Sequence, residues 1–196
     1  MKKILIVVLC VVLIVTLVGC GGTDSYNQKL YEFQMNAFVG GLIAETTGNM
    51  IVNIWHDAIF EEYDDDTKAY AVKEGGYGYN DFNTALALYM ATDSYIDNVA
   101  AMEENQTKVD AMFRDLKEPP KGCEDGYEIA KDIYDAYEDM VNLAKNPTGS
   151  LQTYSPELSD ADSAFMNAYD KLNRYFDSVE FTPKSVESNS TSEATE

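Results

Sequence analysis

Residues that form disulfides or bind metals are scarce in this chain of 196 residues, which has three cysteines and one histidine. Cys10 and Cys20 lie in the first 20 residues, and Cys123 is the only cysteine after them. The sequence beyond residue 20 therefore has no pair for an intramolecular disulfide, and we expect packing alone to stabilise the fold. A zinc site usually combines several His, Cys or carboxylate ligands. Because His56 and Cys123 are far apart in the sequence, we expect no metal and no cofactor, with a weak metal site of His56 and carboxylates as the alternative.

Cys123 itself is expected to have a structural role. It follows the turn-like sequence Pro119-Pro120-Lys121-Gly122 and is followed directly by acidic residues. Neighbouring carboxylates disfavour the thiolate, which is the reactive form of cysteine. We therefore expect a partly buried small residue at the start of a helix and not a nucleophile.

Basic residues are also few. The chain has 14 Lys and Arg against 34 Asp and Glu, which gives a formal net charge of -20. A surface with this charge repels nucleic acid, so we expect no DNA or RNA partner. It also repels anionic lipid headgroups, which favours a domain that is held away from a membrane surface.

Recognised catalytic and ligand-binding motifs are missing from the sequence. There is no Gly-x-Ser-x-Gly motif, and the acidic run Glu61–Asp66 lacks the spacing and the central glycine of a calcium loop. The glycine-rich stretch Gly75–Tyr79 contains no lysine and follows no predicted strand, so it does not resemble a phosphate-binding loop. We therefore predict that the chain is not an enzyme.

The longest apolar stretch runs from Ile4 to Val18, with Thr16 as its one polar residue. Fifteen helical residues span about 22 Å, which is short of the roughly 30 Å of a bilayer core. Two lysines precede the stretch, and small residues follow it. A basic start, an apolar core and small residues at the end are typical of an export signal.

The sequence Leu17-Val18-Gly19-Cys20 at the end of this stretch resembles the lipobox of bacterial lipoproteins. The resemblance implies cleavage after Gly19 and a diacylglyceryl group on the sulfur of Cys20, which would anchor the protein in the lipid bilayer. It also implies a location on the outer face of the cell membrane. An ordinary signal peptide and a short transmembrane helix are the alternatives. The layout is similar to that of small helical lipoproteins of Gram-positive bacteria, although Gram-negative envelopes also contain lipoproteins.

Apolar residues recur at intervals of three and four from Leu30 to Val179, which is the spacing of amphipathic helices. No useful strand-like alternation competes with this pattern. The expected helices cover residues 27–62, 82–90, 93–116, 124–145 and 155–179, and the second and third of these are candidates for one continuous helix. We predict an all-α fold, an antiparallel bundle of about four principal helices after a cleaved apolar signal helix.

Several residues mark the expected ends and contacts of these helices. Asp81 and Asp93 are predicted N-caps, and Ser155-Pro156 is predicted to start the last helix. Gly40-Gly41 predicts either a kink in the first helix or, together with Gly48, a close approach of a second helix.

The expected organisation has four parts. Residues 1–19 are the lipoprotein signal peptide, 20–26 a flexible lipid-anchored tether, 27–181 the bundle domain, and 182–196 a disordered polar tail rich in Ser, Thr and Glu.

Tyrosine is abundant in this sequence, which contains 14 of them. Tyr77 and Tyr79 lie in a predicted loop, and Trp55 adjoins the single histidine, His56. Aromatic side chains in such positions contact peptides, glycans or cationic ligands. We therefore take Trp55, His56, Tyr77 and Tyr79 as a candidate ligand patch, with core packing or plain solvent exposure as the alternative.

These features favour a non-catalytic, membrane-tethered module that binds an envelope protein or a ligand. One alternative is an immunity or exclusion lipoprotein of a phage or mobile element. Another is an accessory solute- or metal-binding lipoprotein of a transporter.

Overall fold

The computed structural model describes residues 22–184, so the predicted signal peptide, the proposed lipidation site Cys20, residue 21 and residues 185–196 lie outside the described part. The described residues are helical, apart from connections and one isolated bridge between Val72 and Tyr79. The helices are α1 (Gly22–Phe60), α2 (Lys68–Ala71), α3 (Phe82–Met90), α4 (Asp93–Asp115), α5 (Glu124–Lys145) and α6 (Leu151–Ser178). Between residues 22 and 184, no helix combines the length and apolar character needed to cross a membrane.

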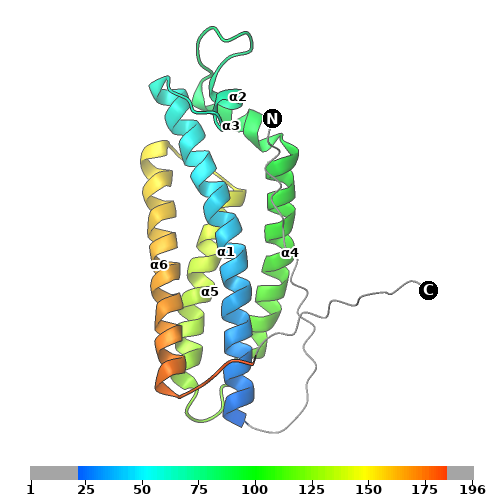
Figure 1. Cartoon of the computed structure of the whole chain (residues 1–196), viewed down its shortest axis with the longest axis vertical. Coiled ribbons are helices and arrows are strands. Elements are labelled where there is room, and N and C mark those ends of the chain that lie inside the picture. Colours follow the sequence, from blue (N-terminus) through cyan, green and yellow to red (C-terminus); the bar gives the residue numbers. More distant parts are fainter. Residues whose placement is uncertain (1–21, 185–196) are drawn as a thin grey trace, which may run out of the picture.

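Four long helices run up and down in an antiparallel bundle (Figure 1). α1 packs against α4, α5 and α6, and α5 also packs against α6. The two short helices, α2 and α3, cover the end of the bundle where α1 finishes (Figure 1). The predicted all-α bundle of about four principal helices is therefore confirmed.

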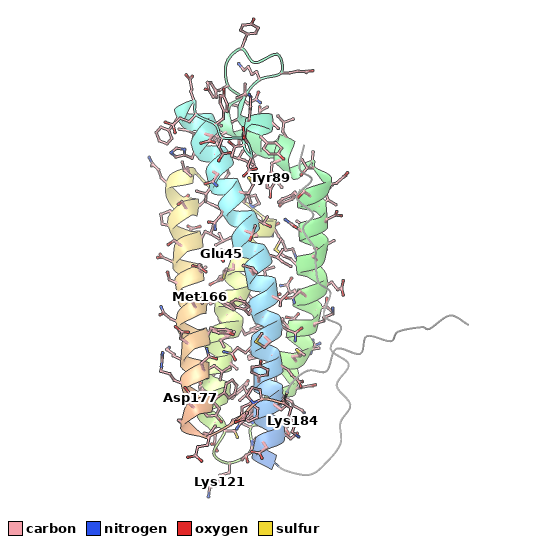
Figure 2. All side chains as sticks on the ribbon, in the orientation of Figure 1. Glu45, Tyr89, Lys121, Met166, Asp177 and Lys184 are labelled. Carbon is pink, nitrogen blue, oxygen red and sulfur yellow. The ribbon has the colours of Figure 1, made fainter. Side chains whose placement is uncertain are left out.

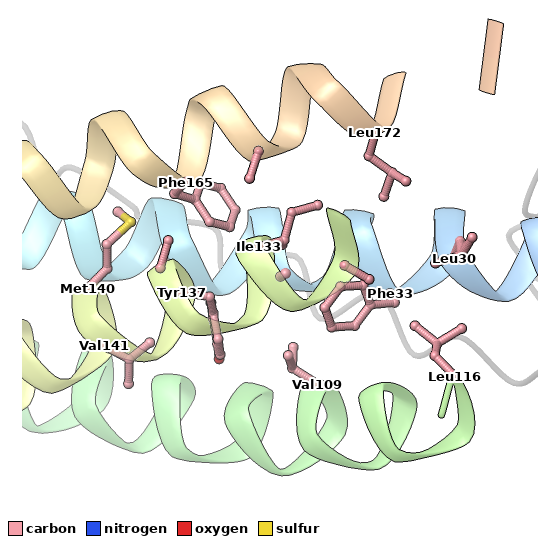
Figure 3. Close-up of a cluster of buried hydrophobic side chains, with 14 of the residues drawn as sticks. Leu30, Phe33, Val109, Leu116, Ile133, Tyr137, Met140, Val141, Phe165 and Leu172 are labelled. Atoms are coloured by element: carbon pink, nitrogen blue, oxygen red, sulfur yellow. The ribbon is translucent and has the colours of Figure 1, made fainter. Parts of the chain in front are cut away.

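The core consists of apolar side chains from all four long helices (Figure 3). Phe33 of α1, Val109 of α4, Ile133 of α5 and Leu172 of α6 are among those with at most 2% of their surface exposed. A fully buried side chain of this size contributes about 1.5–3 kcal/mol relative to an exposed one. A second cluster, centred on Ile51, Trp55 and Tyr154, joins the bundle to α3. The predicted apolar stripes therefore meet in two clusters of buried side chains, and Val99 and Leu143 pack against both.

The glycines of α1 allow neighbouring helices to approach closely. α1 continues as a helix through Gly40-Gly41. A Cβ atom on Gly40 would lie 1.9 Å from Oδ1 of Asn105 and 2.8 Å from Cε2 of Tyr137, and one on Gly48 would lie 2.8 Å from Cδ1 of Leu158. The prediction of a close approach is confirmed, because α4, α5 and α6 occupy the space that side chains would need.

A buried polar connection fills the space beside Gly40. The Nδ2 amide of Asn105 donates to the carbonyl oxygen of Asn36 at 3.1 Å, and the Tyr137 hydroxyl donates to Oδ1 of Asn105 at 2.7 Å. These bonds link α1, α4 and α5 and satisfy an amide in an otherwise apolar interior, where an unpaired group costs about 1–3 kcal/mol. Asn105 thus fixes the relative position of three helices.

α1 begins earlier than the sequence predicted. Residues 22–26, which we expected to be part of a flexible tether, are the first residues of α1. The Tyr26 hydroxyl donates to the carbonyl oxygen of Leu116 at 2.8 Å, and Tyr26 and Asn27 are both buried. Asp24 also lies in the first turn, where a carboxylate interacts favourably with the helix dipole. Tertiary contacts therefore extend the helix toward residue 22.

Two other predicted helix starts are wrong. α3 and α4 are separate helices, and the N-cap of α4 is Thr92, whose Oγ1 accepts from the Tyr95 N–H at 3.2 Å, whereas Asp93 is the first helical residue. α6 starts at Leu151, so Pro156 lies inside the helix. Tyr154 explains this extension, because it is fully buried and its hydroxyl donates to the carbonyl oxygen of Leu143 at 3.0 Å.

Other predicted boundaries agree with the structure. The Asp81 carboxylate caps α3 by accepting from the N–H groups of Asn83 and Thr84, each at 3.1 Å. α5 spans Glu124–Lys145, as predicted. Helix α2 was not predicted, because four residues are too few for a recognisable apolar period.

Candidate functional site

We define the head of the molecule as residues 56–90, which form the end of the bundle opposite the start of α1 (Figure 1). Tyr89 lies in the head, whereas Lys121, Asp177 and Lys184 lie at the other end (Figure 2). At that other end the Lys184 N–H donates to Oε1 of Gln28 at 3.1 Å, and Pro120 lies 4.0 Å from the Cβ position of Gly22. The start of α1 and the end of the described chain are therefore far from the head.

Tyrosines pack together where the head meets the bundle. The Tyr95 hydroxyl donates to the carbonyl oxygens of Ala144 at 3.2 Å and Lys145 at 3.0 Å. The Tyr154 hydroxyl donates to the carbonyl oxygen of Leu143. These bonds satisfy carbonyl groups in the last turn of α5, which lack helical partners. Burial raises the pKa of Tyr89 to about 12, and its ring lies 5.3 Å from that of Tyr95. These tyrosines are neutral structural groups.

A loop of residues 72–80 projects from the head (Figure 1). The Val72–Tyr79 bridge closes its base, and the Lys73 N–H donates to the carbonyl oxygen of Gly78 at 3.0 Å. Three glycines in the loop have φ between +79° and +89°, a region that side chains rarely adopt, and they form its sharp reversal. Tyr77 lies among them with 91% of its surface exposed. The loop presents one aromatic side chain to solvent.

The base of the loop carries a second aromatic group and a cleft. The rings of Tyr79 and Tyr63 are 6.3 Å apart, and the Lys68 Nζ atom lies 5.0 Å from the centre of the Tyr63 ring. A cleft of about 540 Å³ lies beside them, and its lining includes Lys68, Lys73 and Leu88. Within residues 22–184, neither lysine has an ion pair within 4.0 Å. Glu74 also lines the cleft, which therefore combines two lysines and one carboxylate with apolar surface.

Trp55 does not belong to this surface. Only 2% of it is exposed, and its ring packs edge-on against Tyr154 at 5.2 Å and Phe82 at 6.1 Å. It lies on the same buried face of α1 as Ile51, and α3 and α6 cover that face. The prediction that Trp55 faces a ligand is therefore wrong, and the alternative of core packing holds.

His56 is exposed at the end of α1. Its side chain is 47% exposed, its Nδ1 atom lies 3.1 Å from Oδ1 of Asp57, and its ring lies 4.7 Å from that of Phe60. Among the described residues, no hydrogen bond or ring contact joins His56 to Tyr77 or Tyr79. The structure thus places three of the four candidate patch residues on the head without bringing them into one contact group.

Asp57 and Glu62 accompany His56 in a group that sequence reasoning missed. One ligand atom from each of the three side chains lies within 4.8 Å of the others. Glu61 between them has φ of +57°, and the Glu62 N–H donates to the carbonyl oxygen of Asp57 at 3.0 Å. This reversal at the end of α1 returns Glu62 to the side of Asp57. A left-handed residue at a non-glycine position gives no clear sequence signal.

Cys123 is more buried than predicted. It occupies the N-cap position of α5 and is 1% exposed. Its Sγ atom lies 3.8 Å from Oδ1 of Asn27, which also accepts from the Tyr175 hydroxyl at 3.0 Å. Its position is that of a core residue in a polar pocket between three helices.

Comparisons of the chain with protein-family models, with curated proteins and with solved structures found no match.

Proposed function

We propose that this protein is a lipid-anchored extracytoplasmic module, without catalytic activity, that binds an envelope protein through its head. The anchor is Cys20, as the lipobox resemblance implies. The observation that carries the proposal is the separation of the two ends of α1. The proposed anchor lies two residues before Gly22, and the other end of α1 leads directly into the head.

The length of α1 sets the distance between the proposed anchor and the head. Its 39 residues correspond to about 58 Å at 1.5 Å per residue. The two residues from Cys20 to Gly22 add at most about 7 Å. A diacylglyceryl group at Cys20 would therefore hold the start of α1 at the bilayer, while the head reaches well beyond the lipid headgroups. The high negative charge of the chain favours this upright orientation, because anionic headgroups repel acidic surfaces.

The head has the chemistry of a protein-binding surface. Exposed aromatic side chains with few rotatable bonds are common energetic centres of protein interfaces. Tyr77 and Tyr63 are 91% and 48% exposed, and Leu88 on the neighbouring cleft is 45% exposed. Lys68 and Lys73 supply the only positive charges between residues 30 and 107, within a strongly acidic sequence. A partner with an apolar segment, and with a single carboxylate placed against Lys68 or Lys73, would complement this surface.

The proposal predicts the outcome of a membrane capture experiment with labelled fatty acid. We expect wild-type protein to incorporate the label and to co-purify with one partner after mild cross-linking in intact cells. Cys20→Ala should lose the label, because the acylated sulfur is gone. Tyr77→Ser should keep the label and reduce partner recovery about tenfold or more, as loss of a central interface tyrosine does. Quantitative mass spectrometry of the captured proteins measures both effects.

Leu42→Ser provides the matched control. Leu42 is 52% exposed on the flank of α1, outside the head, so its replacement should preserve both the label and the partner. Fatty-acid label on Cys20→Ala would contradict the anchor. Equal loss of the partner in Tyr77→Ser and Leu42→Ser, or undiminished recovery with Tyr77→Ser, would contradict binding through the head.

A further inference from the structure

We propose that the side chains of His56, Asp57 and Glu62 form a Zn²⁺ site at the end of α1. This inference goes beyond the proposed partner binding, and it does not depend on the lipid anchor. It also differs from the sequence-based expectation of no metal, in which a weak site of His56 with carboxylates was only the alternative. One imidazole nitrogen and two carboxylate oxygens are ordinary zinc ligands.

The geometry of the three side chains is close to that of a zinc site. In a tetrahedral site with bonds of about 2.0–2.1 Å, two ligand atoms lie about 3.3 Å apart. Nδ1 of His56 and Oδ1 of Asp57 are 3.1 Å apart, and all three ligand atoms lie within 4.8 Å of one another. The Glu62 side chain is exposed, so rotation about its own bonds can bring a carboxylate oxygen to this spacing.

A hydrogen bond from Thr67 orients the carboxylate of Asp57, the central ligand. The Oγ1 hydroxyl of Thr67 donates to Oδ2 of Asp57 at 2.5 Å, and Thr67 is fully buried. The Asp57 side chain is itself only 13% exposed. Oδ1 of Asp57 consequently remains directed toward His56. Hydrogen bonds that orient a ligating carboxylate in this way are a regular feature of metal sites.

The surrounding charge favours a divalent cation. Six carboxylates occur within ten residues of the chain, at positions 57, 61, 62, 64, 65 and 66. In the described part of the chain, none of them has a Lys or Arg partner within 4.0 Å. A bound cation would relieve the mutual repulsion of these groups.

The presence of a histidine ligand favours zinc over calcium. Calcium takes oxygen ligands, whereas imidazole suits zinc and other transition metals. Three protein ligands leave a fourth position of a tetrahedral zinc ion for water or for a group from another molecule. We therefore expect an open site on the surface of the head.

A zinc titration of the full chain in detergent micelles, followed by NMR of the imidazole ring, tests this site. The chain has one histidine, so the ring signals report on His56 alone. We expect Zn²⁺ to shift these signals and calorimetry to show one zinc per chain. His56→Gln and Glu62→Gln should each weaken zinc binding by about tenfold or more, because each removes a ligand. Ca²⁺ should leave the ring signals unchanged.

Glu61→Gln is the matched control, since it removes the same charge from the neighbouring residue without removing a ligand. We expect its zinc affinity to stay within about twofold of wild type, because an exposed charge next to a site has a small effect. Unchanged imidazole signals with Zn²⁺ would overturn the site. Equal weakening by Glu61→Gln and Glu62→Gln would also overturn it, because that result describes diffuse attraction of cations to acidic residues.

Discussion

Replacement of Trp55 by alanine is expected to lower the free energy of unfolding by about 3–5 kcal/mol. Trp55 is the largest side chain of the cluster that joins α1 to α3 and α6, and it is 2% exposed. Its removal leaves a cavity beside Tyr154 and Phe82, which both pack edge-on against its ring. The loss of these contacts adds to the lost transfer energy, because a packed interior relaxes only partly around a cavity.

Urea unfolding followed by circular dichroism measures this effect, on the chain without its first 19 residues and with Cys20→Ala. Tyr77→Ala is the matched control, since it also truncates an aromatic side chain of the original candidate patch. Tyr77 is 91% exposed, so its loss should change stability by less than about 0.5 kcal/mol. Similar small losses for both variants would contradict the assignment of Trp55 to the core.

Replacement of Gly40 by alanine is expected to destabilise the bundle by about 2–3 kcal/mol. A single methyl group at this position would overlap Oδ1 of Asn105, which lies 1.9 Å from the Cβ position. Asn105 must then move, and the hydrogen bonds that it makes with Asn36 and Tyr137 are strained or lost. This loss exceeds the gain of about 1 kcal/mol that alanine brings to a helix interior.

The adjacent glycine provides a control with the opposite expected sign. The Cβ position of Gly41 lies 3.4 Å from the nearest atoms of Phe165, which is an ordinary packing distance. Gly41→Ala should therefore be neutral or stabilise the fold by up to about 1 kcal/mol, through its higher helix propensity. The same urea unfolding compares the two variants. A Gly40→Ala protein as stable as Gly41→Ala would contradict the close packing of α1 against α4 and α5.

The sequence was sufficient to predict the four long helices, α3 and their buried faces, because apolar spacing reports directly on burial. Trp55 illustrates this, since it continues the stripe of Leu30, Phe33 and Ile51. The incorrect ligand assignment relied on its neighbour His56 and not on the stripe. The spacing of apolar residues thus predicted the burial of Trp55 correctly, whereas its position next to His56 led to the incorrect ligand assignment.

Helix boundaries were less predictable where tertiary contacts extend a helix. Tyr26 and Tyr154 each lie in a segment whose local sequence suggests a tether or a loop. Each donates its hydroxyl proton to a backbone carbonyl of another helix, Leu116 or Leu143. Local propensity contains no information about such distant partners. The same limitation hid the group of His56 and Glu62, which depends on the backbone reversal at Glu61.

The orientation of the head relative to a membrane tests the proposed function most directly. Fluorophores are attached to Tyr77→Cys or Lys121→Cys in the lipidated protein, on vesicles that contain a headgroup-attached contact quencher. Cys123 is 1% exposed and should not react with the dye. Lys121 lies in the loop beside Gly22, whereas Tyr77 lies beyond the other end of α1, about 58 Å along that helix. An upright, lipid-anchored bundle predicts strong quenching at residue 121 and none at residue 77. Equal quenching at both residues, or none at either, would contradict it.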